Sequence, residues 1–130
     1  MYTLTFRDYL KVAHSLKGDI FGPAQMMHVV TYEIDTTYST EELDEYGIIV
    51  DFAAAQETLE AVLKTMNFKN LDEVPELQGM NTTTEVLCKF IHDSMCREIA
   101  DKYRGILKVT MRESPVAWCT YEAPVAPPAA

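Results

Sequence analysis

One segment, residues 26–38, constrains the fold of this chain more than any other. It contains neither Gly nor Pro and is rich in β-branched and aromatic residues, a composition that favours a strand over a helix. At about 3.3 Å per residue, such a strand would span roughly 40 Å. His28 lies near its start, and the only other long strand-like run, residues 2–14, ends at His14. We therefore expect these two strands to pair and the chemistry to lie where the two histidines meet.

The rest of the chain predicts two helices followed by two shorter strands. Apolar side chains alternate along residues 2–14, and Asp8 interrupts the series at a plausible position for a β-bulge. Asp51 is a good N-cap for a first helix. Thr82 and Glu85 have the spacing of a capping box that would open a second helix. Alternating segments at residues 106–113 and 118–121 predict the last two strands.

This order predicts one α+β domain over residues 1–122. Two long strands with a short link, then two helices, then two more strands favour a four-stranded antiparallel sheet with both helices on one face, in the order ββααββ. The Pro- and Ala-rich residues 123–130 have little to bury, and we expect a disordered tail. Because the other face and the edges of the sheet would be bare, we expect a partner subunit.

Composition argues against several classes of partner. The formal net charge of −9 is unfavourable for binding nucleic acid or an anionic membrane surface. No apolar run is long enough to cross a bilayer, and the N-terminus lacks the pattern of a secretory signal. The three cysteines have no CxxC spacing, which is typical of reduced thiols. We therefore expect a soluble, cytoplasmic protein.

Six short motifs carry a resemblance to a known family. Residues 10–16 (LKVAHSL) are similar to F-x-A-A-H-x-L, and residues 81–85 (NTTTE) to N-P-T-x-E. The other four occur in the matching order, at residues 26–30, 47–52, 67–72 and 112–114. Over roughly residues 4–122 the chain resembles the 6-pyruvoyl-tetrahydropterin synthases and their 6-carboxy-tetrahydropterin synthase relatives. The resemblance implies the T-fold, a hexamer of two stacked trimers closed into β-barrels, and pathways such as those to tetrahydrobiopterin and queuosine.

The family's zinc site is incomplete in this sequence. The resemblance implies three histidine ligands, and the corresponding residues are His14, Met26 and His28. A thioether is a poor ligand for Zn²⁺, and two imidazoles leave the ion under-coordinated. We therefore expect no zinc or other cofactor, with these residues as the remnant of a metal site. A zinc ion held by an additional carboxylate is the alternative.

The residues that the resemblance assigns to catalysis are also replaced. Ile20 occupies the position of the family's cysteine, and Asn67 and Phe68 occupy those of its Asp-His pair. None of these side chains transfers a proton near neutral pH. We therefore expect the parent synthase (lyase) activity to be absent and assign no catalytic residue.

The residues matching the family's ligand contacts are retained. Glu113 shares the parity of the apolar residues of its strand, so we expect a buried carboxylate that needs a donor. That donor is an arginine (Arg104 or Arg112), a backbone amide, or, as the resemblance implies, the 2-amino and N3–H edge of a pterin. Thr83, Thr84 and Glu85 match further pterin contacts, although Glu85 is also explained as a capping residue.

These patterns predict a family homologue that binds a pterin-like molecule without zinc and without synthase activity. Two alternatives stay open. One is an enzyme for a different, metal-independent reaction of a pterin or purine. The other is a structural or regulatory oligomer whose pocket is vestigial.

Overall fold

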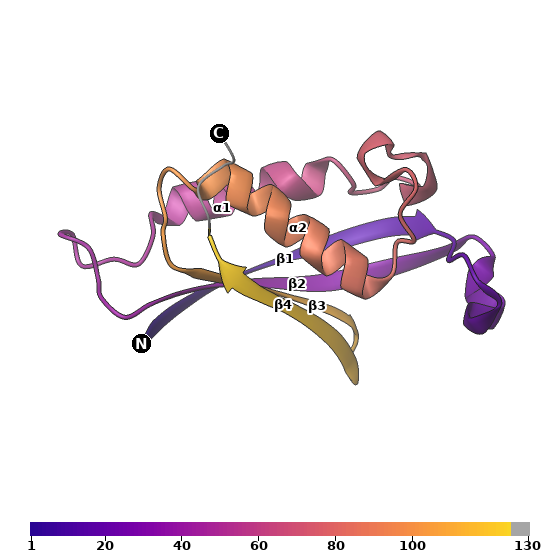
Figure 1. The fold of residues 1–130 in the computed structure, drawn as a ribbon, viewed down its shortest axis with the longest axis horizontal. Helices are drawn as coiled ribbons and strands as arrows, with labels where there is room; N and C mark the ends of the chain where they lie inside the picture. Colours follow the sequence, from indigo (N-terminus) through magenta and orange to yellow (C-terminus); the bar gives the residue numbers. More distant parts are fainter. Residues whose placement is uncertain (126–130) are drawn as a thin grey trace.

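The protein is a four-stranded antiparallel sheet with two α-helices on one face. The computed structural model describes residues 1–125. The strands lie in the order β1-β2-β3-β4 and comprise β1 (Tyr2–His14), β2 (His28–Thr40), β3 (Ile106–Ser114) and β4 (Ala117–Pro124). The helices α1 (Phe52–Lys64) and α2 (Thr84–Ile99) lie side by side across the sheet (Figure 1), and the short 3₁₀ helices are η1 (Asp19–Gln25), η2 (Leu71–Glu73) and η3 (Pro75–Leu77). The predicted α+β architecture and element order are confirmed. Within residues 1–125, no helix is both long and apolar enough to span a bilayer.

The two long strands form a continuous ribbon. Their register runs without a shift from Tyr2 opposite Thr40 to His14 opposite His28. The predicted bulge at Asp8 is therefore wrong, because this half-buried aspartate keeps its regular place opposite Ile34. Its carboxylate accepts a hydrogen bond from the Tyr9 backbone amide at 2.7 Å. The charged side chain is therefore accommodated without interrupting the pairing of β1 with β2.

The second strand begins two residues later than predicted. Met26 is the residue that follows η1, and its backbone amide bonds to the Pro23 carbonyl at 3.1 Å, so pairing starts at His28. The other end of the chain extends further than predicted. β4 continues to Pro124, and the amide of the buried Val125 donates to the Gly105 carbonyl at 2.9 Å. The remaining tail residues, 126–130, lie outside the described part of the chain.

Each helix begins at a side-chain cap. The predicted cap Asp51 accepts a hydrogen bond from the Ala54 amide at 2.8 Å. The second helix is capped by Thr83, whose hydroxyl accepts from the Val86 amide at 3.2 Å, and not by Thr82. The predicted cap is therefore wrong by one residue, and the predicted capping box with Glu85 does not form. Both helices place their buried sides on the core, which includes Leu10, Tyr32, Ile34, Leu59, Leu63, Leu87, Ile91, Met95, Leu107 and Met111.

A loop covers part of one sheet edge. The Phe68 amide donates to the Lys11 carbonyl at 2.7 Å, and the Ala13 amide donates to the Lys69 carbonyl at 3.0 Å. Asn67 completes this contact by accepting from the Lys11 amide at 2.9 Å. Within the described residues, the earlier part of the β1 edge and the outer edge of β4 have no partner strand.

The helix-free face of the sheet carries a compact group of charges, here called the charged cluster: Arg7, Glu33, Asp35 and Arg112. Arg7 holds the Asp35 carboxylate with two bonds of 2.8 and 3.1 Å, and Arg112 adds a third of 2.6 Å. Both arginines also approach Glu33, at 3.2 and 3.6 Å. These contacts, led by the hydrogen bond from Arg7, lower the pKa of Asp35. The four charges of the cluster are thus paired with one another.

Candidate ligand-binding site

The four residues predicted to bind a ligand line one cavity. It measures about 330 Å³ and lies between the N-terminal end of α2 and the β3–β4 hairpin. Its walls are Leu16, Phe21, Thr83, Thr84, Glu85, Glu113, Ala117, Trp118 and Cys119. Larger hollows lie elsewhere on the described chain. Those of about 510, 660 and 370 Å³ contain none of the predicted site residues, and one of about 490 Å³ along α2 contains only Glu85 of them.

Glu113 lies at an irregularity of the sheet. The register between β3 and β4 shifts between Arg112 and Ser114, so Glu113 is the extra residue of a bulge. It is exposed, which corrects the expectation of a buried carboxylate: the strand has bent beyond the part that the helices cover. Within residues 1–125 its carboxylate has no hydrogen-bond or ion-pair partner. Arg112, one of the predicted donors, is instead bound to Asp35 on the opposite face.

The start of α2 supplies the opposite wall. The Thr83 hydroxyl is the helix cap, and the Thr84 hydroxyl lies 3.4 Å from the Tyr32 hydroxyl. Burial raises the pKa of that tyrosine, so it stays protonated and able to donate. Glu85 is exposed and, with the capping box absent, has no partner in the described chain. The cavity therefore presents two free carboxylates, Glu85 and Glu113, and polar hydroxyls between them.

A pair of histidines lies where β1 ends and β2 begins. The rings of His14 and His28 are 4.6 Å apart, centroid to centroid. His14 is buried, and its Nδ1 lies 3.0 Å from the Thr82 hydroxyl. Its Nε2 has no partner in the described chain. Burial, together with the neighbouring His28, lowers the pKa of His14 below 6.5, which favours the neutral ring.

The residues around this pair do not fit a zinc ion. His28 donates from Nδ1 to the Met26 carbonyl at 2.9 Å, and the Met26 side chain is largely exposed. Asp72, whose charge acts on His14, is bound to the amide and hydroxyl of Ser15. Among the described residues, no group of three His, Cys, Asp or Glu side chains could hold a metal. A zinc site needs at least one more ligand than these two imidazoles provide.

The positions of the family's catalytic residues are separate from the cavity walls. Ile20 is 89% exposed on η1, and Phe68 is 80% exposed with φ of 61°. Asn67 is occupied by its bond to the β1 edge.

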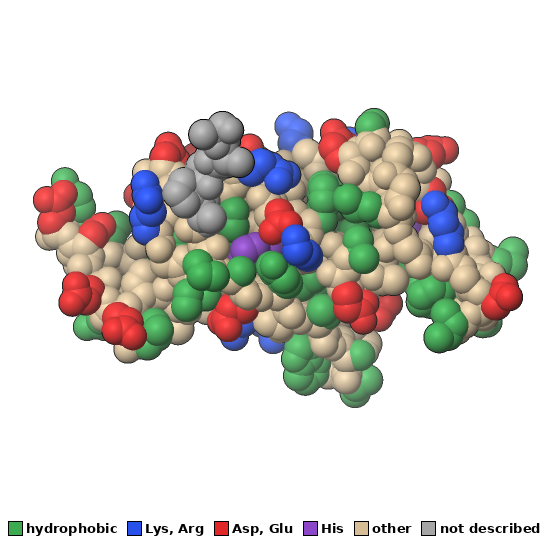
Figure 2. All heavy atoms as spheres, viewed as in Figure 1, with side chains coloured by type: hydrophobic (Ala, Val, Ile, Leu, Met, Phe, Trp, Pro, Cys, Tyr) green, Lys and Arg blue, Asp and Glu red, His purple; other side chains and the backbone are tan. Residues whose placement is uncertain are grey.

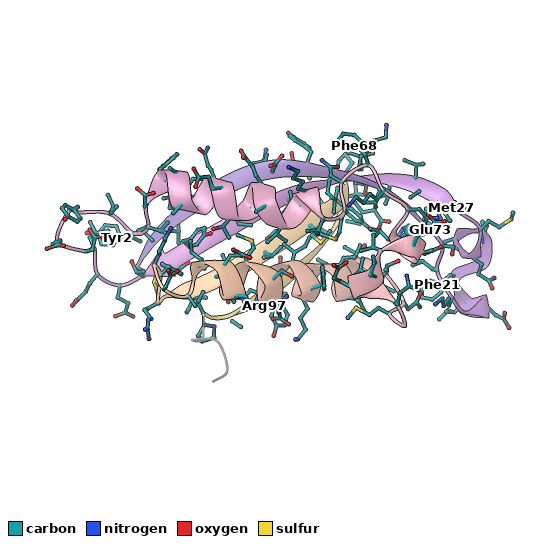
Figure 3. All side chains as sticks on the ribbon, turned by 90° about the horizontal axis from the view of Figure 1, so that it is seen from above. Tyr2, Phe21, Met27, Phe68, Glu73 and Arg97 are labelled. Atoms are coloured by element: carbon teal, nitrogen blue, oxygen red, sulfur yellow. The ribbon has the colours of Figure 1, made fainter. Side chains whose placement is uncertain are left out.

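Seen from above, Phe21, Met27, Phe68 and Glu73 lie at one end of the molecule and Tyr2 at the other (Figure 3). Figure 2 shows hydrophobic side chains gathered at this end and on the tip of the β3–β4 hairpin.

Several residues of the site were not predicted from the sequence. Thr82 links His14 to the start of α2, whereas the sequence offered it only as a cap. Phe21 comes from the link between the long strands, where no periodicity marks it. Trp118 is the single tryptophan of the chain, and this rarity was the one available signal.

Comparisons with known proteins match the whole described domain. The family model for 6-pyruvoyl tetrahydropterin synthase matches residues 3–124. The 6-carboxy-5,6,7,8-tetrahydropterin synthase of Bacillus subtilis is 22% identical over 116 residues, covering 87% of this chain and 80% of the relative. The 6-pyruvoyl tetrahydrobiopterin synthase of Dictyostelium discoideum is 29% identical over 109 residues, covering 75% of this chain and 81% of the relative.

Solved structures show the same fold. The 6-pyruvoyl tetrahydropterin synthase of Caenorhabditis elegans superposes with a TM-score of 0.80 at 21% identity, covering 94% of this chain and 95% of that one. The enzyme of Plasmodium falciparum gives a TM-score of 0.74 at 10% identity, covering 95% and 98%. The predicted T-fold is therefore confirmed.

Proposed function

The chain belongs to the 6-pyruvoyl tetrahydropterin synthase family, and we propose that it binds a pterin-like heterocycle in the cavity between α2 and the β3–β4 hairpin without carrying out the family's synthase reaction. The observation that carries this proposal is the meeting of Glu113, Thr83, Thr84 and Glu85 around one cavity. These residues come from segments far apart in the sequence.

The chemistry of the cavity suits the donor edge of a pterin. Its 2-amino group and N3–H present two parallel donors, which a carboxylate accepts in bidentate fashion. Glu113 has no protein partner in the described chain, so it is free to accept such an edge. An exposed carboxylate costs little in the empty protein, which removes the need for a structural cation beside it.

The absence of synthase activity rests on three positions. Ile20, Asn67 and Phe68 supply no thiol, carboxylate or imidazole, and Asn67 is used to fasten a loop to β1. The matched relatives are named as synthases, so turnover must be measured directly. We expect no conversion of the synthase substrate and less than one tenth of a zinc ion per chain by elemental analysis; stoichiometric zinc would contradict the ligand count.

His14 favours a second candidate, a metal-independent proton transfer on a bound pterin or purine. Its Nε2 is buried without a partner in residues 1–125, and its Nδ1 contacts Thr82, the residue before the cavity-lining Thr83. Its lowered pKa favours a neutral ring able to accept a proton. His14→Gln would abolish such a reaction while leaving pterin affinity close to wild type. Loss of affinity instead would assign this histidine to binding.

Assembly and location follow the family resemblance. We infer a homo-oligomer, in keeping with a sheet whose described edges are open, and we expect a hexamer in the cytoplasm. Light scattering at micromolar concentration tests the first point, and a stable monomer would contradict it.

Calorimetric titration with pterin tests the binding proposal. A hydrogen bond to a charged group contributes about 1.5–3 kcal/mol, so Glu113→Gln is expected to weaken pterin binding roughly ten- to a hundredfold. Glu122→Gln is the matched control, because Glu122 is exposed on β4 and outside the cavity. Lumazine, in which a carbonyl replaces the 2-amino donor, is expected to bind the wild-type protein more weakly than pterin. Absence of pterin binding, or equal binding by Glu113→Gln, would overturn the proposal.

A further inference from the structure

Trp118 stands at the mouth of the candidate site although it belongs to the other face of the sheet. It pairs with Arg112 across the β3–β4 ladder, whereas the next residue, Cys119, pairs with the buried Met111. Successive side chains on a strand point to opposite faces, so Trp118 and Glu113 would not normally share a cavity. The bulge at Glu113 redirects the strand, and both residues line the same space.

The indole is held from one side by Arg112. The guanidinium carbon lies 5.8 Å from the centre of the Trp118 ring, within the range of a cation–π contact. Arg112 is itself fixed by Asp35 at 2.6 Å, and Asp35 is bound by Arg7. Arg112 thus belongs to the charged cluster and also contacts Trp118, which lines the cavity.

The remaining surface of the indole is available. Trp118 is 59% exposed, and the other walls supply two apolar side chains, Leu16 and Phe21, in addition to the carboxylates. Aromatic surfaces beside a few fixed polar groups are typical of sites for planar ligands. A carboxylate that accepts from the ring edge would leave the ring face to pack on such a surface.

We propose that Trp118 is a specificity-determining residue on which a planar heterocycle stacks, and that Arg112 is the positioning residue that holds the indole. This inference rests on the proposed function, because it assigns a second contact to the same ligand. It selects for flat, fully conjugated rings such as pterin over reduced, puckered ones such as tetrahydropterin. Glu113 would recognise the edge of the ring, and Trp118 its planarity.

Three variants test the stacking contact by calorimetric titration with pterin. Base–aromatic stacking predicts that Trp118→Leu weakens pterin binding roughly five- to a hundredfold. Trp118→Phe, which keeps an aromatic face, is expected to stay within about threefold of wild type. Val116→Ala is the control, because Val116 is also exposed at the hairpin, 87% against 59% for Trp118, and does not line the cavity. The ratio of pterin to tetrahydropterin affinity should fall in Trp118→Leu.

Tryptophan fluorescence tests the role of Arg112, since Trp118 is the only tryptophan. Arg112→Met is expected to lower the fluorescence anisotropy of the free protein and to weaken pterin binding a few fold. A purely structural role would change the melting temperature but not the anisotropy.

The outcomes separate the two proposals. If the wild-type protein binds no pterin, the proposed function fails and this inference fails with it. If the wild type binds pterin and Trp118→Leu binds equally well, the inference alone is overturned. Unchanged anisotropy in Arg112→Met would remove the positioning role and leave stacking to be judged by the leucine variant.

Discussion

The charged cluster differs from the cavity end of the sheet, which carries Glu85, Glu113 and His14, in whether its polar groups have hydrogen-bonding partners. In the cluster, every carboxylate is paired, and Asp35 accepts three hydrogen bonds from two arginines. At the cavity end, Glu85 and Glu113 have no partner in the described chain, and His14 keeps a buried nitrogen unpaired. Satisfied polar groups stabilise a fold, whereas unsatisfied ones mark a site that a ligand completes. We therefore expect the cluster to stabilise the fold, and the contrast supports the proposal that the cavity end binds a ligand.

The largest expected effect is at the centre of the cluster. Asp35→Asn removes the charge that two arginines share, and hydrogen bonds to charged groups contribute about 1.5–3 kcal/mol each. Because both arginines are partly exposed, we expect a total loss of about 2–3 kcal/mol in the free energy of unfolding. Urea denaturation checks this, with the exposed Asp101→Asn as control. A loss below about 0.5 kcal/mol would mean that the cluster is not a stabilising feature.

The second expected effect is at Phe68, near the cavity end. A non-glycine residue with φ of 61° is strained by about 1–2 kcal/mol, and glycine relieves this at some cost in chain entropy. We expect Phe68→Gly to be about 1 kcal/mol more stable than Phe68→Ala, which removes the same ring but keeps the strain. Thermal melting of the two variants measures the difference. If both variants are much less stable than wild type, the exposed ring is instead buried against a second copy of the chain.

A smaller effect should appear as a pH dependence. The folded protein lowers the pKa of His14 below its ordinary 6.5, so the unfolded chain binds the proton more tightly. The free energy of unfolding should therefore fall as the pH drops below about 6.5 and be fully retained above it. Melting temperatures between pH 7.5 and 5.5 show this before carboxylates with ordinary pKa values titrate. His14→Gln should flatten the curve; an identical slope would show that the histidine does not contribute.

The smallest expected effect on stability is at the cavity carboxylates. Glu113→Gln and Glu85→Gln should each change the free energy of unfolding by less than about 0.5 kcal/mol, because neither side chain has a partner to lose within residues 1–125. This outcome, together with the large loss for Asp35→Asn, would show that the charged cluster stabilises the fold and that the cavity carboxylates do not. Strong destabilisation by either change would instead reveal a structural partner, for example in a neighbouring subunit, and would contradict this difference between the two regions.

The sequence predicted the elements well because their patterns are local. The alternation over residues 2–14 and the apolar stripe after Asp51 are set by strand and helix periods, and both elements formed as expected. The cap of α2 was misplaced because Thr82, Thr83 and Thr84 are equivalent in sequence. In the folded protein, the Thr82 hydroxyl is hydrogen-bonded to His14 and does not cap the helix. This contact depends on tertiary structure.

The site was predicted only in part because its remaining features depend on tertiary structure. The exposure of Glu113 depends on a bulge that no residue type announces, since the apolar parity of the strand continues through it. No local pattern in the sequence predicts that Arg112 binds Asp35, because the two residues are 77 positions apart. Phe21 reaches the cavity from a link without periodicity. Trp118 lies in a predicted strand, but it lines the cavity only because the register shifts at the neighbouring bulge.

The loop at residues 67–70 also limits what the long ribbon can accept at its edge. Because it uses the outward backbone groups of Lys11 and Ala13, a guest strand added there must stop before Lys11. The free edge that remains runs over the nine residues from Tyr2 to Leu10, one more than the eight residues of β4. The loop therefore prevents an added strand from shifting past Lys11, and it reduces the number of pairing registers that the β1 edge allows.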